Sequence, residues 1–190
     1  MGQDQSPEDN QKSRLDRGML RARKIQRDEF KHCPRTPITL ILDGVKGTYN
    51  QGAIFRLCDA FLLEKVHFCG AKVEAWHKRF LKSARGTHKW VDYEADAAVL
   101  ETVLAYRERG YQIIVAEQCT GSVPLEAVNF AAPVCLILGS ELEGVSQAVV
   151  DMADVVVELP TMGMANSLNV SMSAGMMVLS AYQSIRASSR

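Results

Sequence analysis

Short apolar runs alternate with helical stretches along the chain from residue 38 onward. Continuous apolar segments are typical of strands that are buried on both faces of a sheet. We expect strands at 38–45, 65–70, 111–117, 133–140 and 155–160, with 89–93 as a weaker candidate. Stretches of helical character separate them, at 52–63, 76–84, 96–109, 146–153 and 167–187. This alternation predicts an α/β fold whose parallel sheet is flanked by helices.

The segment before residue 38 follows a different pattern. Leu15, Met19, Ala22 and Ile25 are spaced like the apolar stripe of a helix whose other faces are basic. Residues 11–35 carry nine basic and three acidic side chains, although the formal net charge of the whole chain is zero. Two prolines at 34 and 37 end this helix, because proline lacks a backbone donor and restricts the residue before it. We therefore expect a basic N-terminal arm with an amphipathic helix, 1–37, and a main domain, 38–190.

Length and composition limit the class of protein. A chain of 190 residues can bury one substantial core but is too short for two independent enzyme domains. No apolar run reaches the roughly 18 to 20 residues that a membrane span needs, and the polar, acidic N-terminus is unlike a secretory signal. The five cysteines contain no CxxC pair, which argues against disulfides and a zinc site. We expect a cytoplasmic protein with reduced thiols, no membrane contact and no metal.

Two turns that follow apolar strands contain candidate chemistry. The first, Asn50-Gln-Gly-Ala-Ile-Phe-Arg56, opens a helix, and its arginine could bind a phosphate or be an ordinary solvated side chain. The second, Leu138-Gly-Ser-Glu-Leu-Glu-Gly144, matches neither a P-loop nor a dinucleotide-binding fingerprint. It could be a plain strand-to-helix turn. However, Glu141 lies where open α/β sheets place their ligand-binding residues.

A third cluster spans 159–175 and leads into the last helix. Ser167 or Asn166 is suited to be the N-cap of that helix. Asn169, Ser171 and Ser173 then enter the helix between apolar residues. A buried polar group without a partner costs roughly 1 to 3 kcal/mol, so some of these side chains should face partners in the interior or in a site.

Together the three segments resemble the motifs of a known family. Asn-x-Gly-Ala-x-x-Arg at 50–56, Leu-Gly-Ser-Glu-x-x-Gly at 138–144 and Pro-x-x-Gly-x-x-x-Ser-Leu-Asn-Val-Ser at 160–171 are similar to the three motifs of the SpoU (TrmH) family of the SPOUT superfamily. The similarity extends over residues 38–186. It implies a methyltransferase domain with a C-terminal deep trefoil knot, an exception to the usual absence of knots. It also implies a homodimer that uses S-adenosyl-L-methionine to methylate ribose 2'-hydroxyls of RNA.

The resemblance also implies a set of site residues. The residues that match the family's catalytic positions are Asn50, Arg56, Glu141, Ser167 and Asn169. Those expected to contact the cofactor are Ala116, Glu117, Leu138, Gly139, Ser140, Gly144, Leu159, Pro160, Met162, Ser167 and Leu168. Family proposals make Arg56 a general base toward the 2'-hydroxyl. A guanidinium rarely gives up its proton, so positioning a phosphate and stabilising a developing alkoxide is the alternative role.

Basic residues suggest where RNA binds. Trp76 and Trp90 flank five basic side chains and no acidic one, a composition that suits RNA, although a solvated helix with core tryptophans is the alternative. The expected RNA contacts are Lys78, Arg79, Lys82, Arg85 and Lys89, together with Arg21, Arg23, Lys24 and Arg27 of the arm. The chain shows no separate RNA-binding domain, which favours tRNA over rRNA. Two alternative functions are a catalytically silent knotted RNA-binding protein and a base-methylating SPOUT enzyme. The presence of Arg56 argues against the base-methylating enzyme.

Overall fold

The computed structural model describes residues 14–188 and separates into two compact units, Met1–Cys33 and Pro34–Arg190. The side chain of Arg27 is outside the described part, so the RNA contact predicted for it is not placed. No helix of the described chain is long and apolar enough to span a membrane.

In the first unit, two short helices replace the single amphipathic helix that the apolar spacing predicted. They are α1 (Arg17–Ala22) and α2 (Arg27–Phe30). Asp16 caps α1 by accepting the backbone N–H of Met19 at 2.8 Å. Gln26 and Glu29 form a capping box that starts α2. The prediction of one helix was wrong because apolar spacing does not register a second N-cap inside the same segment.

The second unit is built on a sheet of seven parallel strands in the order β3-β2-β1-β6-β4-β7-β5. The strands are β1 (Thr36–Asp43), β2 (Leu63–Cys69), β3 (Tyr93–Ala97), β4 (Gln112–Ala116), β5 (Val123–Pro124), β6 (Val134–Gly139) and β7 (Val155–Glu158). Asp43 is level with Gly139, and Ala116 with both Leu138 and Val157. The carboxyl ends of the four central strands therefore meet at one edge of the sheet.

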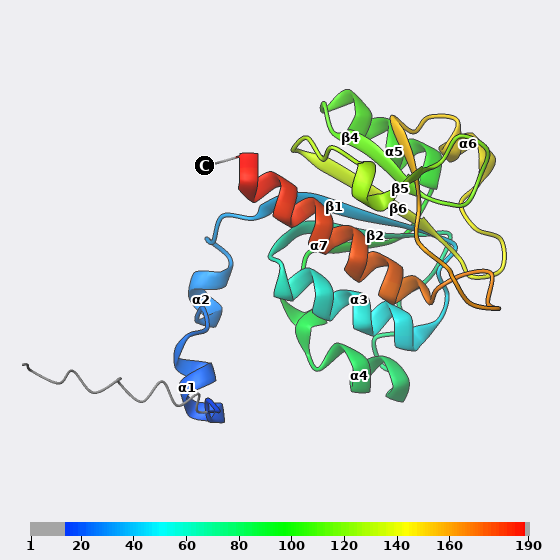
Figure 1. Ribbon diagram of the computed structural model, residues 1–190. Coiled ribbons are helices and arrows are strands. Elements are labelled where there is room, and N and C mark those ends of the chain that lie inside the picture. The colour runs from blue at the N-terminus through cyan, green and yellow to red at the C-terminus, as the bar shows by residue number, and fades with distance from the viewer. Residues whose placement is uncertain (1–13, 189–190) are drawn as a thin grey trace, which may run out of the picture. The chain divides into compact units, whose positions relative to one another are not determined.

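Helices cover both faces of this sheet (Figure 1). They are α3 (Thr48–Ala60), α4 (Lys78–Ala84), α5 (Val99–Glu108), α6 (Gln147–Val150) and α7 (Val170–Ser188). Leu40 and Leu42 pack with α3, α4 and α7 on one face, whereas Ile41 packs with α5 and α6 on the other. Both faces of the central strands are thus buried, which confirms the fold class expected from continuous apolar runs.

Most predicted elements of the second unit are present, with shifted ends, and one is largely wrong. The weaker strand candidate at 89–93 begins at the end of a 3₁₀ turn, Thr87–Lys89, and only its last residue, Tyr93, belongs to a strand, β3. The backbone N–H groups of Trp90 and Val91 both bond to the carbonyl of Thr87, which holds this turn. The two-residue strand β5 was not predicted, because a segment that short has no periodicity to detect.

Helices α3 and α4 are in close contact at Gly52. A Cβ atom at this position would overlap the side chain of Ser83 and the backbone of Phe80. Only glycine lets the two helices come this close. The contact fixes α4 relative to the helix that carries Asn50.

A buried histidine makes the stability of the fold depend on pH. His67 lies on β2, where its Nε2 atom is 2.9 Å from the hydroxyl oxygen of Tyr106. Burial, with the nearby Lys65 charge, lowers the pKa of His67 to about 4. The unfolded chain therefore binds this proton more tightly, and the stabilisation present above about pH 6.5 is lost as the pH falls toward 4. We expect the free energy of unfolding to drop by about 3 kcal/mol from this residue alone.

Urea unfolding at pH 7 and at pH 4.5 tests this expectation. His67→Asn keeps hydrogen-bonding groups but cannot take up a proton, so its free energy of unfolding should change less between the two pH values than that of the natural chain. An equal change in both proteins would show that other groups cause the acid sensitivity.

Candidate active site

A cavity of about 510 Å³ lies at the edge where the central strands end. Its walls come from the segments that follow β4, β6 and β7 and from the first turn of α7. The predicted cofactor residues that line it are Ala116, Glu117, Leu138, Gly139, Ser140, Gly144, Leu159, Ser167 and Leu168. Pro160 and Met162 are not among its lining residues, and Met162 is fully exposed. Cavities of roughly 300 to 1,000 Å³ are typical of cofactor sites.

The loop after β6 is folded tightly on itself. A Cβ atom on Gly139 would overlap the backbone of Gly144 and Val145. Glu117 closes the loop from the end of β4, because its carboxylate accepts the backbone N–H of Val145 at 2.8 Å. The carboxylate of Asp43 accepts the N–H of Ser146 at 3.0 Å from the end of β1. Two carboxylates, from the ends of the strands on either side of β6, therefore hold this loop in place.

Three predicted polar residues come together beside this loop. The amide of Asn50, in the first turn of α3, donates to the carboxylate of Glu141. Its carbonyl oxygen accepts from the amide nitrogen of Asn169 at 3.0 Å. Asn169 in turn accepts from the backbone N–H of Ser171 at 3.0 Å and from its hydroxyl at 2.6 Å. We call Asn50, Glu141 and Asn169 the amide cluster.

Asn169 also settles which residue begins the last helix. The prediction of Ser167 or Asn166 as N-cap was wrong, because α7 starts at Val170 and the side chain of Asn169 accepts the N–H of Ser171. Ser167 instead lines the cavity, and so does Ser173, one helical turn beyond Asn169. The polar residues that interrupt the apolar pattern of this helix thus divide between the cap and the cavity wall.

Arg56 lies away from the amide cluster. It follows Asn50 by six residues on α3, which places it about 120° around the helix and roughly 9 Å along it. The side chain is exposed and does not line the cavity. The sequence pairs these two residues in one motif, but within a single chain the structure does not bring them together.

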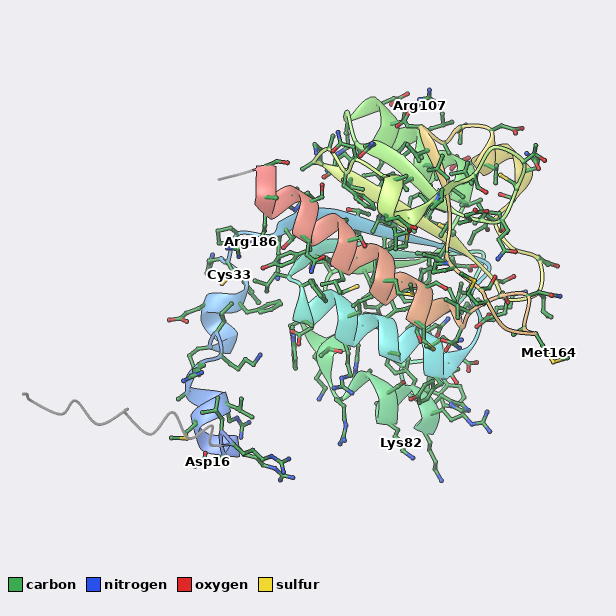
Figure 2. All side chains as sticks on the ribbon, in the orientation of Figure 1. Asp16, Cys33, Lys82, Arg107, Met164 and Arg186 are labelled. Atoms are coloured by element: carbon green, nitrogen blue, oxygen red, sulfur yellow. The ribbon has the colours of Figure 1, made fainter. Side chains whose placement is uncertain are left out.

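The basic residues predicted to bind RNA are on the surface. Lys78, Arg79, Lys82, Arg85 and Lys89 are all exposed, as are Arg21, Arg23 and Lys24 of the first unit. Figure 2 shows the side chain of Lys82 extending from α4 away from the sheet. In residues 14–188, no group of three or more His, Cys, Asp or Glu side chains is arranged to hold a metal ion.

Two interactions at the site were missed from the sequence. Asp43 was not singled out, although an acidic residue that ends a buried strand just before a glycine is a detectable signal. Glu117 was predicted to contact the cofactor, yet its carboxylate bonds to the backbone of the neighbouring loop. No local pattern could show that pairing, because 28 residues separate the two partners.

Comparison with known proteins identifies the family that this chain resembles. The family model described as "SpoU rRNA Methylase family" matches residues 37–179. A tRNA (guanosine(18)-2'-O)-methyltransferase of Aquifex aeolicus is 34% identical over 147 residues, which cover 76% of this chain and 68% of that protein. The enzyme of the same name from Thermus thermophilus is 27% identical over 84% of this chain and 81% of its own length. A crystal structure titled A. aeolicus TrmH/SpoU tRNA modifying enzyme superimposes with a TM-score of 0.71 at 31% identity, covering 82% of this chain and 79% of that one.

Proposed function

This chain belongs to the SpoU rRNA Methylase family, and we propose that it transfers a methyl group from S-adenosylmethionine to a ribose 2'-hydroxyl of tRNA. The observation that carries the proposal is the amide cluster, which lies beside a cavity of cofactor size. The two relatives quoted above, from Aquifex aeolicus and Thermus thermophilus, are both named tRNA 2'-O-methyltransferases, which supports tRNA as the substrate.

The cavity residues fit S-adenosylmethionine. Leu138, Leu159 and Leu168 supply apolar walls for an adenine ring, and the turn at Gly139 to Gly144 offers backbone groups to its polar edges. Glu117 and the absence of a side chain at Gly139 keep this turn tightly folded. When bound, S-adenosylmethionine supplies an electrophilic methyl group on a sulfonium centre.

The amide cluster and Arg56 would then act on the ribose and its phosphate. Asn50 and Asn169 orient each other, so their polar atoms are fixed before the substrate arrives and need no reorganisation. Asn50 holds Glu141 at the rim of the cavity, where the remaining lone pairs of the carboxylate can accept a hydrogen bond from a ribose hydroxyl. Arg56 binds the adjacent phosphate and stabilises negative charge that develops on the 2'-oxygen. This assignment gives the arginine a positioning task and leaves its own proton in place, so the proton of the 2'-hydroxyl passes to water.

Methyl transfer to purified RNA tests the function. Labelled S-adenosylmethionine and unmodified tRNA should yield RNA in which the label sits on a ribose 2'-oxygen at one position. Calorimetry should show that the protein binds S-adenosylmethionine or S-adenosylhomocysteine. Label on a base would favour the base-methylating alternative, and RNA binding without transfer would favour the silent one.

We further propose a homodimer. Met172 and Leu179 on α7 are 60% and 44% exposed, and Met176 lies between them on the same helix face. Tyr49 and Arg56 share the exposed face of neighbouring α3. A second copy over these faces would cover the apolar side chains and bring its own Arg56 toward the cavity, which completes the site. Sedimentation at micromolar concentration should show a dimer that Met172→Glu weakens, and a monomeric natural chain would contradict this.

The deep trefoil knot and the cytoplasmic location belong to the same proposal. Membership of the family supports the knot, and the packing of α7 against α3, β1 and β6 is compatible with it. The cytoplasmic location stays a prediction from the sequence.

The arm is expected to bind RNA phosphates and to have no part in chemistry. Arg21, Arg23 and Lys24 are exposed in the first unit, which is separate from the cavity-bearing unit. Deleting residues 1–33 should weaken tRNA binding and flatten its salt dependence, because each neutralised phosphate contributes to the salt slope. Filter binding at several salt concentrations measures both effects. Cofactor affinity should not change; its loss would show that the arm belongs to the catalytic unit.

A further inference from the structure

We propose that Trp76 stacks on an unpaired base of the RNA substrate. The inference rests on the proposed function, because it names a contact of the same RNA outside the methylation site. The structure distinguishes Trp76 from Trp90 by their surroundings, which the sequence alone did not show.

The two tryptophans have opposite surroundings. Trp90 is half-buried, packs against the core, and donates its indole N–H to the carboxylate of Asp59 at 2.7 Å. Trp76 is 74% exposed, and its only recorded ring neighbour among the described residues is the imidazole of His77, 5.9 Å away and tilted. An exposed indole presents a large flat surface that every nucleobase can cover.

The surroundings of Trp76 fit a polyanion. The next fifteen residues contain five basic side chains and no acidic one. Lys78, Arg79 and Lys82 of α4 are exposed, and no ion pair is recorded for them within residues 14–188. Cations without acidic partners beside an exposed aromatic ring are the combination by which proteins bind single-stranded RNA. A protein partner with an apolar surface would gain nothing from these charges, and we therefore choose RNA.

Trp76 is also anchored close to the amide cluster. Its chain neighbour His77 places Nδ1 3.3 Å from the hydroxyl oxygen of Thr48, the first residue of α3 and two residues before Asn50. The same Nδ1 accepts the N–H of Arg79, which caps α4. With the close helix contact at Gly52, these bonds hold the loop of Trp76 against the helix that carries the site. A base stacked on Trp76 would therefore belong to a nucleotide near the methylated ribose.

Tryptophan fluorescence tests the stacking directly, since the chain has two tryptophans. Trp90→Phe leaves Trp76 as the single emitter. Unmodified tRNA and oligoadenylate should quench its emission, whereas an abasic oligomer of the same length and charge should not. Trp76→Phe leaves Trp90, whose emission should stay nearly constant with all three ligands. If Trp90→Phe proves unstable, the difference between the natural chain and Trp76→Phe measures the same quenching.

Affinity measurements supply the second readout. Trp76→Ala should weaken tRNA binding about tenfold or more without changing the salt slope, and Trp76→Phe should recover part of the loss because it keeps a ring. Lys82→Ala is the matched control: it should reduce the salt slope and leave quenching intact. Equal quenching by the abasic oligomer, or unchanged affinity in Trp76→Ala, would overturn the proposal. A change in emission on self-association without RNA would assign the ring to a second copy.

These outcomes are separable from failure of the proposed function. If the natural chain binds tRNA with base-dependent quenching but transfers no methyl group, the methyltransferase assignment fails and the stacking contact stands. If it methylates tRNA and Trp76→Ala retains full affinity, the stacking contact fails alone.

Discussion

Replacing Arg56 with alanine should slow methyl transfer to tRNA by roughly 10²- to 10³-fold, the cost of removing one group that stabilises developing charge. Affinity for S-adenosylmethionine should stay nearly the same, because the exposed Arg56 does not line the cofactor cavity of its own chain. Single-turnover transfer and calorimetry measure the two quantities separately. Arg107→Ala is a matched control, since Arg107 is an exposed arginine on α5 that bonds to the carbonyl of Met152.

Arg56→Lys distinguishes the two roles considered for this residue. Lysine keeps the charge and has a lower reference pKa of about 10.4, so a mechanism that needs deprotonation should retain activity with a shifted pH profile. It loses the planar fork that binds a phosphate through two parallel hydrogen bonds. We expect lysine to be nearly as inactive as alanine. A fully active Arg56→Ala enzyme would remove the arginine from the mechanism.

The sheet could be predicted from the sequence because its central strands are buried on both faces. β4 and β6 are apolar almost throughout, and β1 carries the run Ile38–Leu42 interrupted only by Thr39. Short apolar runs of this kind, bounded by turns, are typical of strands buried on both faces. At the edge, β3 has mostly exposed residues and carries no such signal. Trp90 and Val91 before it belong to a turn, and their apolar character in the sequence gave the false strand candidate.

The site was predictable in part, for a different reason. Asn50, Glu141 and Asn169 lie in three motifs that the strand ends bring to one edge, so fold class and motif order were enough to group them. Arg56 shares a motif with Asn50, but the predicted helix began at residue 52 and left Asn50 outside it. The structure starts α3 at Thr48, so both residues lie on one helix, whose geometry separates their side chains. The exposure of the two tryptophans could not be predicted either, because it depends on which neighbours the fold places around each ring.

Gly139→Ala should abolish cofactor binding. The new methyl group would overlap the backbone of Gly144 and Val145, and backbone atoms cannot move aside as a flexible side chain can. The loop must open to relieve this overlap, which breaks the bond between Glu117 and the N–H of Val145. Because that loop forms the cavity floor, calorimetry should detect no binding of S-adenosylmethionine at millimolar concentration. Urea unfolding should show a loss of about 1 to 3 kcal/mol, the usual cost of overpacking.

Gly163→Ala provides the control for this prediction. Gly163 belongs to the third motif as Gly139 belongs to the second, but a Cβ atom there meets nothing within 4 Å, and its backbone is not in the left-handed region. Adding the same methyl group should therefore leave both stability and cofactor binding close to those of the natural chain. If Gly139→Ala bound the cofactor as tightly as Gly163→Ala does, the tight turn would be dispensable, and the cavity beside it could not be the cofactor site.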